Sequence, residues 1–287
     1  LTLIGKTILS GRVGELNPLE RLVVQGDLEV NTDRITTTGG QDYQGKVQLN
    51  RDSNFTASEI NFARAVDALQ AGNQGLVLNG NATFRDTVGA NSRLRFLTVN
   101  GTTLADGDRI NTTGDQTYQG LITLAQSVTF DAGDSGNIYF NGGVQGQDHR
   151  LTIANAQDVL APQPIRVYQF EQQQGTGFSN FTGGLFTGDD IVINTRRING
   201  NFEGDQVYLN GRDGITGHVI ANQLVLNGSH GGGLTGTINN REGPSAADQA
   251  LLFSGANGAF YVNGRLVTGF TDDISNILED KTHLGAF

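Results

Sequence analysis

The chain has 287 residues, of which 41 are glycine and 17% are charged, and it contains no cysteine, methionine or tryptophan. Its 37% hydrophobic residues can form a core, but no apolar run reaches the roughly 18 residues of a membrane-spanning helix. The absence of cysteine excludes disulfides and thiolate metal sites, and a net charge of −10 without a basic cluster argues against nucleic acid and membrane partners.

After an apolar N-terminal segment, the chain contains a long internal duplication. Residues Ile35 to Leu49 (ITTTGGQDYQGKVQL) match Ile110 to Leu124 (INTTGDQTYQGLITL) at an offset of 75 residues. The similarity extends on both sides, so that one copy covers about residues 22–96 and the next about residues 97–171. A tandem repeat of this kind is typical of proteins that stack one structural unit on the next.

A shorter unit recurs within and beyond the duplication. Segments of alternating apolar residues end in Asn-Gly, as in residues 76–80, 207–211 and 224–228, and many lie 17 to 21 residues apart or at multiples of that spacing. Alternation predicts strands with one buried face, and Asn and Gly mark the turns. A coil of about 20 residues favours a β-solenoid over an antiparallel sandwich, whose turns recur about every 8 to 12 residues. Thr and Asn at residues 36–38 and 111–113 are expected to stack in ladders along the coil corners.

The sequence therefore predicts an all-β fold, a right-handed parallel β-helix (β-solenoid) with a short C-terminal helix. Residues 58–71 have two readings. Their apolar residues at helical spacing, followed by Gly72, suit a helix, whereas residues 60–62 align with the strand-like residues 138–140 of the second copy. We favour the strand.

The whole chain is predicted to divide into four segments. Residues 1–156 form the solenoid with its two repeats of about 75 residues, and residues 157–184, which contain two prolines and a Gln run, are predicted to leave the stack as a loop excursion. The solenoid is predicted to continue over residues 185–269 and to end in a helical cap or tail over residues 270–287.

The predicted terminal helix covers residues 271–281 (TDDISNILEDK). Thr271 suits the N-cap, the two aspartates that follow suit the positive helix start, and Ile274, Ile277 and Leu278 form one apolar face. Such a helix is expected to cover the last coil.

The block ITTTG-x-Q-x-Y-x-G-x-V-x-L, followed by an Ile-x-Phe strand and an Asn-Gly unit, resembles repeats of large secreted bacterial β-helix proteins, namely filamentous-haemagglutinin-like adhesins and autotransporter passengers. The resemblance covers about residues 22–153. It implies a right-handed parallel β-helix, an extracellular or cell-surface location, and a role in adhesion or surface coats. It implies no shared catalytic residues.

Other β-helix proteins cleave polysaccharides, so candidate catalytic groups need to be weighed. Asp33 and Asp189 are 156 residues apart, which corresponds to about eight coils or roughly 38 Å, whereas glycoside hydrolysis needs two carboxylates about 5 to 10 Å apart. Asp189 and Asp190 are expected at a loop-to-strand junction, pointing to opposite faces if the backbone is extended. We therefore expect no catalytic site and no enzyme activity.

No cofactor is expected. The histidines lack the spacing of a zinc site. The acidic clusters at residues 106–108 and 131–134 suit at most weak calcium binding and are expected to be solvated turns.

The sequence favours an extracellular structural or adhesive rod that associates with itself, as a head-to-tail oligomer or a filament. Unpaired backbone groups at the end of a stack can template another chain. The residues expected to make the end contacts are Leu1, Leu3, Ile4, Ile8, Ile274, Ile277 and Leu278.

The alternative is a carbohydrate-binding or polysaccharide-cleaving β-helix protein with surface glycans as partners. In this reading residues 157–184 form a wall over a sugar groove. The aromatic residues of that wall are Tyr168, Phe170, Phe178 and Phe181.

Overall fold

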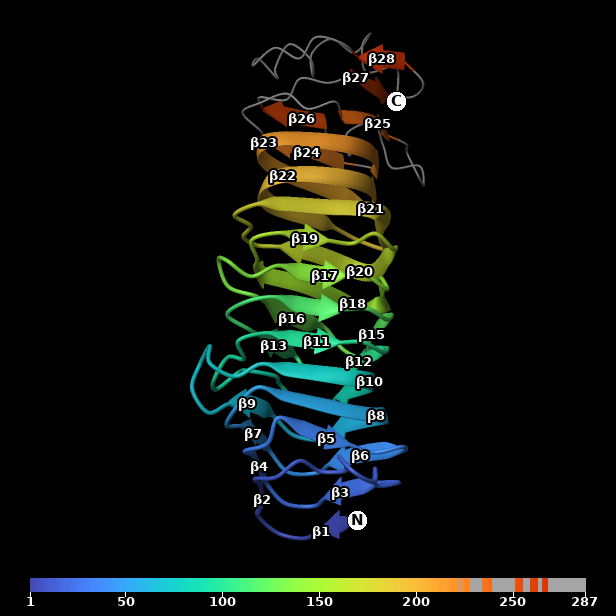
Figure 1. Ribbon diagram of the computed structural model, residues 1–287. Coiled ribbons are helices and arrows are strands. Elements are labelled where there is room, and N and C mark those ends of the chain that lie inside the picture. Colours follow the sequence, from blue (N-terminus) through green and yellow to red (C-terminus); the bar gives the residue numbers. More distant parts are fainter. Residues whose placement is uncertain (222, 228–233, 239–250, 255–258, 263–264, 268–287) are drawn as a thin grey trace.

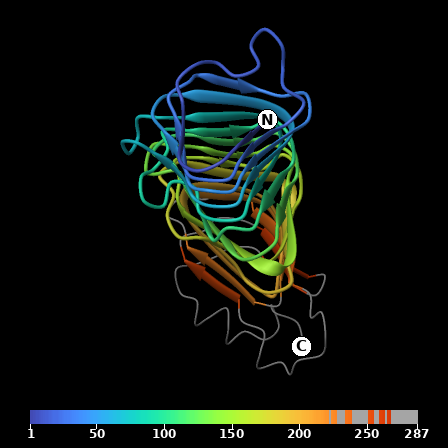
Figure 2. The same ribbon diagram turned by 90° about the horizontal axis from the view of Figure 1, so that it is seen from below.

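The computed structural model describes residues 1–221, 223–227, 234–238, 251–254, 259–262 and 265–267. Over these residues the chain is a parallel β-solenoid without a helix, and it forms a long rod with the N-terminus at one end (Figure 1). Seen from below, the coils lie over one another (Figure 2). The predicted all-β solenoid is confirmed, whereas the predicted terminal helix at residues 271–281 lies outside the described residues.

Each coil crosses three faces, and each face is a column of parallel strands about one coil apart in sequence. Face 1 consists of β1 (Thr2–Leu3), β3 (Leu22–Val24), β6 (Gly40–Tyr43), the ends of β8 (Ser53–Phe62) and β10 (Leu76–Phe84), β12 (Thr103–Ala105), β15 (Ile122–Leu124), the starts of β18 (Val144–Asn155) and β20 (Ile165–Gln172), the ends of β21 (Phe178–Thr187), β22 (Ile191–Glu203) and β23 (Gln206–Ala221), then β25 (Leu234–Ile238) and β27 (Ala259–Val262).

The other two faces are built in the same way. Face 2 consists of β2 (Thr7–Leu9), β4 (Leu28–Val30), β7 (Val47–Leu49), β9 (Val66–Ala68), the bridging residue Val88, β13 (Arg109–Asn111), β16 (Val128–Asp131), the ends of β18 and β20, the starts of β22 and β23, β24 (Gln223–Asn227) and β26 (Leu251–Ser254). Face 3 consists of β5 (Arg34–Thr36), the starts of β8 and β10, β11 (Leu97–Val99), β14 (Gln116–Tyr118), β17 (Ile138–Phe140), β19 (Val159–Leu160), the start of β21 and the middle parts of β22 and β23. Outside this scheme, β28 (Arg265–Val267) pairs antiparallel with β27.

The core forms because alternate residues of each pass point inward. In β3, Leu22 and Val24 are fully buried while Val23 between them faces outward. Aromatic rings stack from coil to coil in this interior. The ring of Phe62 lies 5.2 Å from that of Tyr43 and 5.4 Å from that of Phe84, both nearly parallel. Burying one large apolar side chain stabilises the fold by roughly 1.5–3 kcal/mol, so stability is distributed along the whole rod.

Glycine columns fill turns where the coils approach most closely. A Cβ atom on Gly45 would lie 2.4 Å from the carbonyl oxygen of Gly26 in the preceding coil, and one on Gly120 would lie 2.5 Å from that of Gly101. Real Cβ atoms do not approach backbone this closely, so only glycine fits at these corners.

The two sequence repeats have the same interior but occupy different faces. Leu22 lies on face 1 and its equivalent Leu97 on face 3, while Ile35 lies on face 3 and its equivalent Ile110 on face 2. One repeat makes eleven passes across a face: β3, β4, β5, β6, β7, two by β8, β9, two by β10, and Val88. Eleven passes are two more than three complete turns, so the second copy is rotated by one face relative to the first.

A buried polar network gives the repeat motif its conserved spacing. In the second copy Gln116 is fully buried; its Nε2 donates to the carbonyl oxygens of Ile110 and Asp131 and to Thr112 Oγ1, and its Oε1 accepts from the Tyr118 hydroxyl. Burial without partners would be costly, and these bonds satisfy the side chain. The first copy has the same network 75 residues earlier, at Gln41, Ile35, Thr56, Thr37 and Tyr43.

The structure also extends the duplication to the N-terminus. Gly14 and Gly89 are 75 residues apart, both have positive φ, and both lie against a carbonyl oxygen of the following coil. Their neighbours Val13 and Val88 form equivalent bridges, to Ile35 and Ile110. The sequence comparison began the first copy only at residue 22.

Two predicted segments are settled by the strands. Residues 58–71 contain the end of β8 and all of β9, so the strand reading is confirmed and the helix is wrong. The loop excursion predicted for residues 157–184 is not found, because β19, β20 and the start of β21 keep this segment within the stack. Pro162 and Pro164 lie in the turn between β19 and β20, where the missing N–H breaks no ladder.

Candidate functional site

The coil of residues 1–13 presents core positions that no other coil within the described residues covers. Leu1 and Leu3 are in register with the fully buried Leu22 and Val24, yet Leu1 is 60% exposed. Both strands of this coil, β1 and β2, pair on one side only, with β3 and β4. This open coil is the first candidate interaction site, and it contains four of the residues that sequence reasoning singled out.

The inward residues of the open coil come from all three faces. Leu3, Leu9 and Val13 pack against the end of the core on faces 1, 2 and 3 and are only partly buried. Sequence reasoning missed Leu9 and Val13. The alternation of Thr7-Ile8-Leu9 would have indicated Leu9, because its register partner Val30 is buried.

Two of the predicted contact residues lie differently. Ile8 is in register with Glu29, an outward position, and it is 55% exposed; Ile4 is 82% exposed. Ile4 and Ile8 therefore belong to the outer surface of the coil. The predicted contact residues Ile274, Ile277 and Leu278 lie outside the described residues.

A covered version of the same surface exists further along the chain. Leu76 and Leu78 lie 75 residues after Leu1 and Leu3, at the positions equivalent by the repeat offset, and both are fully buried. They are covered by the start of β8, with Ser53 opposite Leu76 and Phe55 opposite Leu78. The open coil therefore has the side-chain pattern that elsewhere in this chain accepts a preceding coil.

Three carboxylates converge at the turn after β21. Asp189, Asp190 and Asp205 each offer an oxygen within 4.8 Å of the others. Asp189 and Asp190 occupy the predicted loop-to-strand junction, where the backbone is not extended and both side chains reach the same place. Oxygen ligands suit Ca²⁺, but that ion usually takes six to eight of them, so the three carboxylates form an incomplete shell.

Within this cluster, the surroundings of Asp190 oppose its ionisation. Desolvation and the neighbouring charge of Asp189 raise the pKa of Asp190, against a hydrogen bond from Gln169 Nε2. The Oδ1 atom of Asp190 is buried and has no hydrogen-bond partner. The charged form of Asp190 is therefore disfavoured at this turn.

Three other acidic residues considered in the sequence, Asp33, Asp106 and Asp131, form ion pairs. Asp106 lies 3.5 Å from Arg85 and Asp131 lies 2.5 Å from Arg93. Asp33 pairs with Arg12, which lowers the pKa of Asp33 to about 2 through a hydrogen bond that outweighs desolvation.

Asp33 and Asp189 are far apart, as predicted. Eight coil steps separate β3, which begins the coil of Asp33, from the end of β21, which precedes Asp189. At about 4.8 Å per step this is roughly 38 Å, too far for a pair of carboxylates to act on one glycosidic bond.

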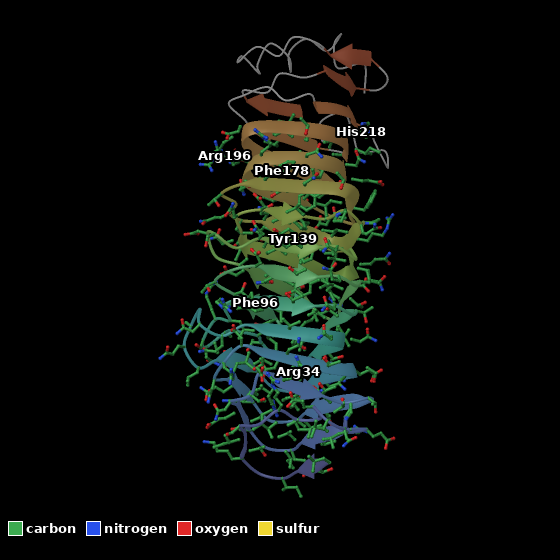
Figure 3. The ribbon with its side chains drawn as sticks, in the orientation of Figure 1. Arg34, Phe96, Tyr139, Phe178, Arg196 and His218 are labelled. Carbon is green, nitrogen blue, oxygen red and sulfur yellow. The ribbon has the colours of Figure 1, made fainter. Side chains whose placement is uncertain are left out.

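The aromatic residues proposed as a sugar wall are divided between core and surface. Phe170 and Phe181 are fully buried and pack edge to face at 5.4 Å. Tyr168 is 48% exposed, and Phe178, labelled in Figure 3, is half-buried at the start of β21. They do not form one wall.

No family model, curated protein or solved structure matches the chain. Within the residues that the structure describes, none of the elements is a helix long and apolar enough to cross a membrane.

Proposed function

We propose that this protein is an extracellular structural and adhesive rod that assembles head to tail through its open N-terminal coil. The observation that carries the proposal is the exposed core register of Leu1 and Leu3, whose equivalents Leu76 and Leu78 are covered by a preceding coil. In this proposal a coil from a second copy of the chain stacks on Leu1 and Leu3.

The mode of joining follows from how the coils already stack. Apart from the pairing of β27 with β28, the described strands pair parallel, so a coil that continues the stack runs in the same direction. Such a contact is heterologous and repeats without closing, which produces a filament. The resemblance to secreted β-helix repeats supports an extracellular location.

Sedimentation velocity over a range of protein concentrations, with negative-stain electron microscopy, tests the proposal. The wild-type chain is expected to form rods of increasing length. Leu9→Asn places a polar group in the inward set and is expected to weaken association about 30-fold, because burial of one such side chain contributes about 2 kcal/mol. Ile8→Asn changes the adjacent outward residue and is the matched control, expected to assemble like wild type.

Wild-type protein that remains a monomer at the highest concentration would contradict the proposal. Association that stops at a dimer would contradict the head-to-tail mode, because two N-terminal coils facing each other form a closed pair. Equal effects of Leu9→Asn and Ile8→Asn would show that the inward residues are not the contact.

A further inference from the structure

A polar groove with a volume of about 390 Å³ crosses four successive coils of face 2. Its central column runs from Arg109 in β13 through Thr129 and Thr152 to Glu171 in β20, each in register with the next. Three coil steps of about 4.8 Å give a floor roughly 15 Å long. The volume lies within the range of ligand-binding pockets.

The charges in the groove leave one guanidinium without a partner. Arg93 Nη2 lies 2.5 Å from Asp131 Oδ2, and Arg150 Nη1 lies 3.7 Å from Glu171 Oε2. Arg109 makes no ion pair and no side-chain hydrogen bond within the described part of the chain. Three arginines against two carboxylates give the groove one excess positive charge, in a protein with a net charge of −10.

The carboxylate of Asp131 is paired within the groove. Burial acts to raise the pKa of Asp131, but hydrogen bonds from Arg93 and the Gly133 N–H, with the charges of Arg93 and Arg109, lower it overall. Asp131 is therefore hydrogen-bonded to Arg93, whereas Arg109 acts on it through its charge alone.

A buried amide next to Arg109 lacks a hydrogen-bond partner. Asn111 lines the groove, is 6% exposed, and its Oδ1 atom is buried without a donor. Buried polar atoms are normally paired, so this acceptor matches a donor that the chain does not supply. A ligand hydroxyl can provide it, and the hydroxyl of Thr129 lies in the next coil of the same floor.

We propose that this groove binds a carboxylate-bearing polysaccharide, with Arg109 pairing with one carboxylate and Asn111 and Thr129 contacting sugar hydroxyls. A single excess charge beside hydroxyl and amide groups suits a monoanionic sugar unit, and an open floor of four coils suits a chain. The groove deepens the adhesive part of the proposed function by naming a ligand class. It does not depend on head-to-tail joining, so either proposal can fail alone.

Calorimetric titration of the 287-residue chain with trigalacturonate tests the site, and the fully methyl-esterified trimer is the neutral match. The acid is expected to bind and the ester to bind at least about fivefold more weakly, since an Arg–carboxylate hydrogen bond is charge-assisted. Added salt is expected to weaken binding of the acid, because exposed charges are screened.

Two groove variants shift the affinity in opposite directions. Arg109→Gln is expected to weaken binding about fivefold to tenfold. Glu171→Gln removes the carboxylate that competes for Arg150 and is expected to strengthen binding about twofold to fivefold. Arg34→Gln, at an outward arginine nearer the N-terminal end (Figure 3), is the control and is expected to bind like wild type.

Several results would overturn the site. These are no binding by wild type, equal binding of acid and ester, or an Arg109→Gln variant that binds like wild type. An equal loss of affinity in Arg34→Gln would show that binding depends on the overall charge of the protein and not on this groove. Galacturonate monomer binding as tightly as the trimer would show that the groove recognises a lone carboxylate and no polysaccharide. Circular dichroism of each variant confirms that the fold is intact.

Discussion

At the scale of single residues, inward polar side chains are tolerated only where the coil satisfies them. Gln116 and Gln41 achieve this through equivalent networks on different faces. Asp190 is the contrasting case, because its carboxylate lies beside Asp189 and Asp205 and one of its oxygens has no partner. We expect the first two positions to tolerate little change and the third to gain from losing its charge.

Asp190→Asn is predicted to raise the melting temperature at pH 7 by about 1–2 °C. Because the folded-state pKa of Asp190 is raised, its stabilising contribution is complete below the ordinary aspartate pKa and is lost as pH rises through the folded value. The gain in the variant should therefore disappear near pH 3. Scanning calorimetry at both pH values measures it, with the exposed Asp148→Asn as control. A lower melting temperature at pH 7 would show that the charge is stabilised.

At the scale of elements, the stack depends on turns in which backbone meets backbone. The corner at Gly120 has no room for a side chain because the carbonyl of Gly101 lies directly beneath it. By contrast, a Cβ atom on Gly11 would meet no other atom within 4 Å. Substitution of these two glycines therefore distinguishes the effect of a close backbone contact, present only at Gly120, from the effect of a lost glycine in a loop.

Gly120→Ala is therefore predicted to destabilise the protein by about 2 kcal/mol, while Gly11→Ala leaves it unchanged. The midpoint of urea unfolding, followed by circular dichroism, measures both. If Gly120→Ala unfolds at the wild-type midpoint, the coils separate at this corner more easily than the backbone geometry indicates.

The strands were predictable where the local pattern alone decides them. Alternation and Asn-Gly turns located β10 and β24, and the duplication placed β8 correctly against a competing helical spacing. Residues 157–184 were wrongly predicted to leave the stack. The prolines lie in a turn, and the Gln run contributes Gln172 to the core, where the Ser179 hydroxyl donates a hydrogen bond to it. A polar inward residue in a strand cannot be recognised without knowing its partner.

The candidate sites were predictable only in part. The apolar N-terminus indicated an open end, but which of its residues face inward follows from pairing with the next coil, and this selected Leu9 and Val13 over Ile4 and Ile8. The polar groove of face 2 combines residues from β13, β16, β18 and β20 with Arg93 from a loop. No local motif marks it, because its members meet only through the register.

At the scale of the whole molecule, the repeat is a unit that the stack can gain or lose. Deletion of residues 22–96 removes eleven passes and places β11 where β3 was, with Gly101 above Gly5 and the network of Gln116 in the place of that of Gln41. The rod should remain folded and become shorter by roughly 18 Å, which small-angle X-ray scattering measures. Its strand signal per residue should match that of the full chain.

Deletion of residues 22–97 is the matched control, since one further residue reverses the alternation at the junction and turns core side chains outward. It is expected to unfold at a markedly lower temperature than the first deletion. Similar melting temperatures for the two deletions would show that the junction does not depend on register.

The one-face rotation between the copies also governs how such a protein changes length during evolution. Insertion of a single repeat unit lengthens the rod but rotates all following coils by a third of a revolution. The polar groove would then face a different side of the rod. Three inserted units add eleven whole revolutions, so every surface in the following coils again faces its original direction. Insertion of three repeats therefore keeps the outward-facing residues of the rod in line, whereas insertion of one or two repeats changes their direction around the rod axis.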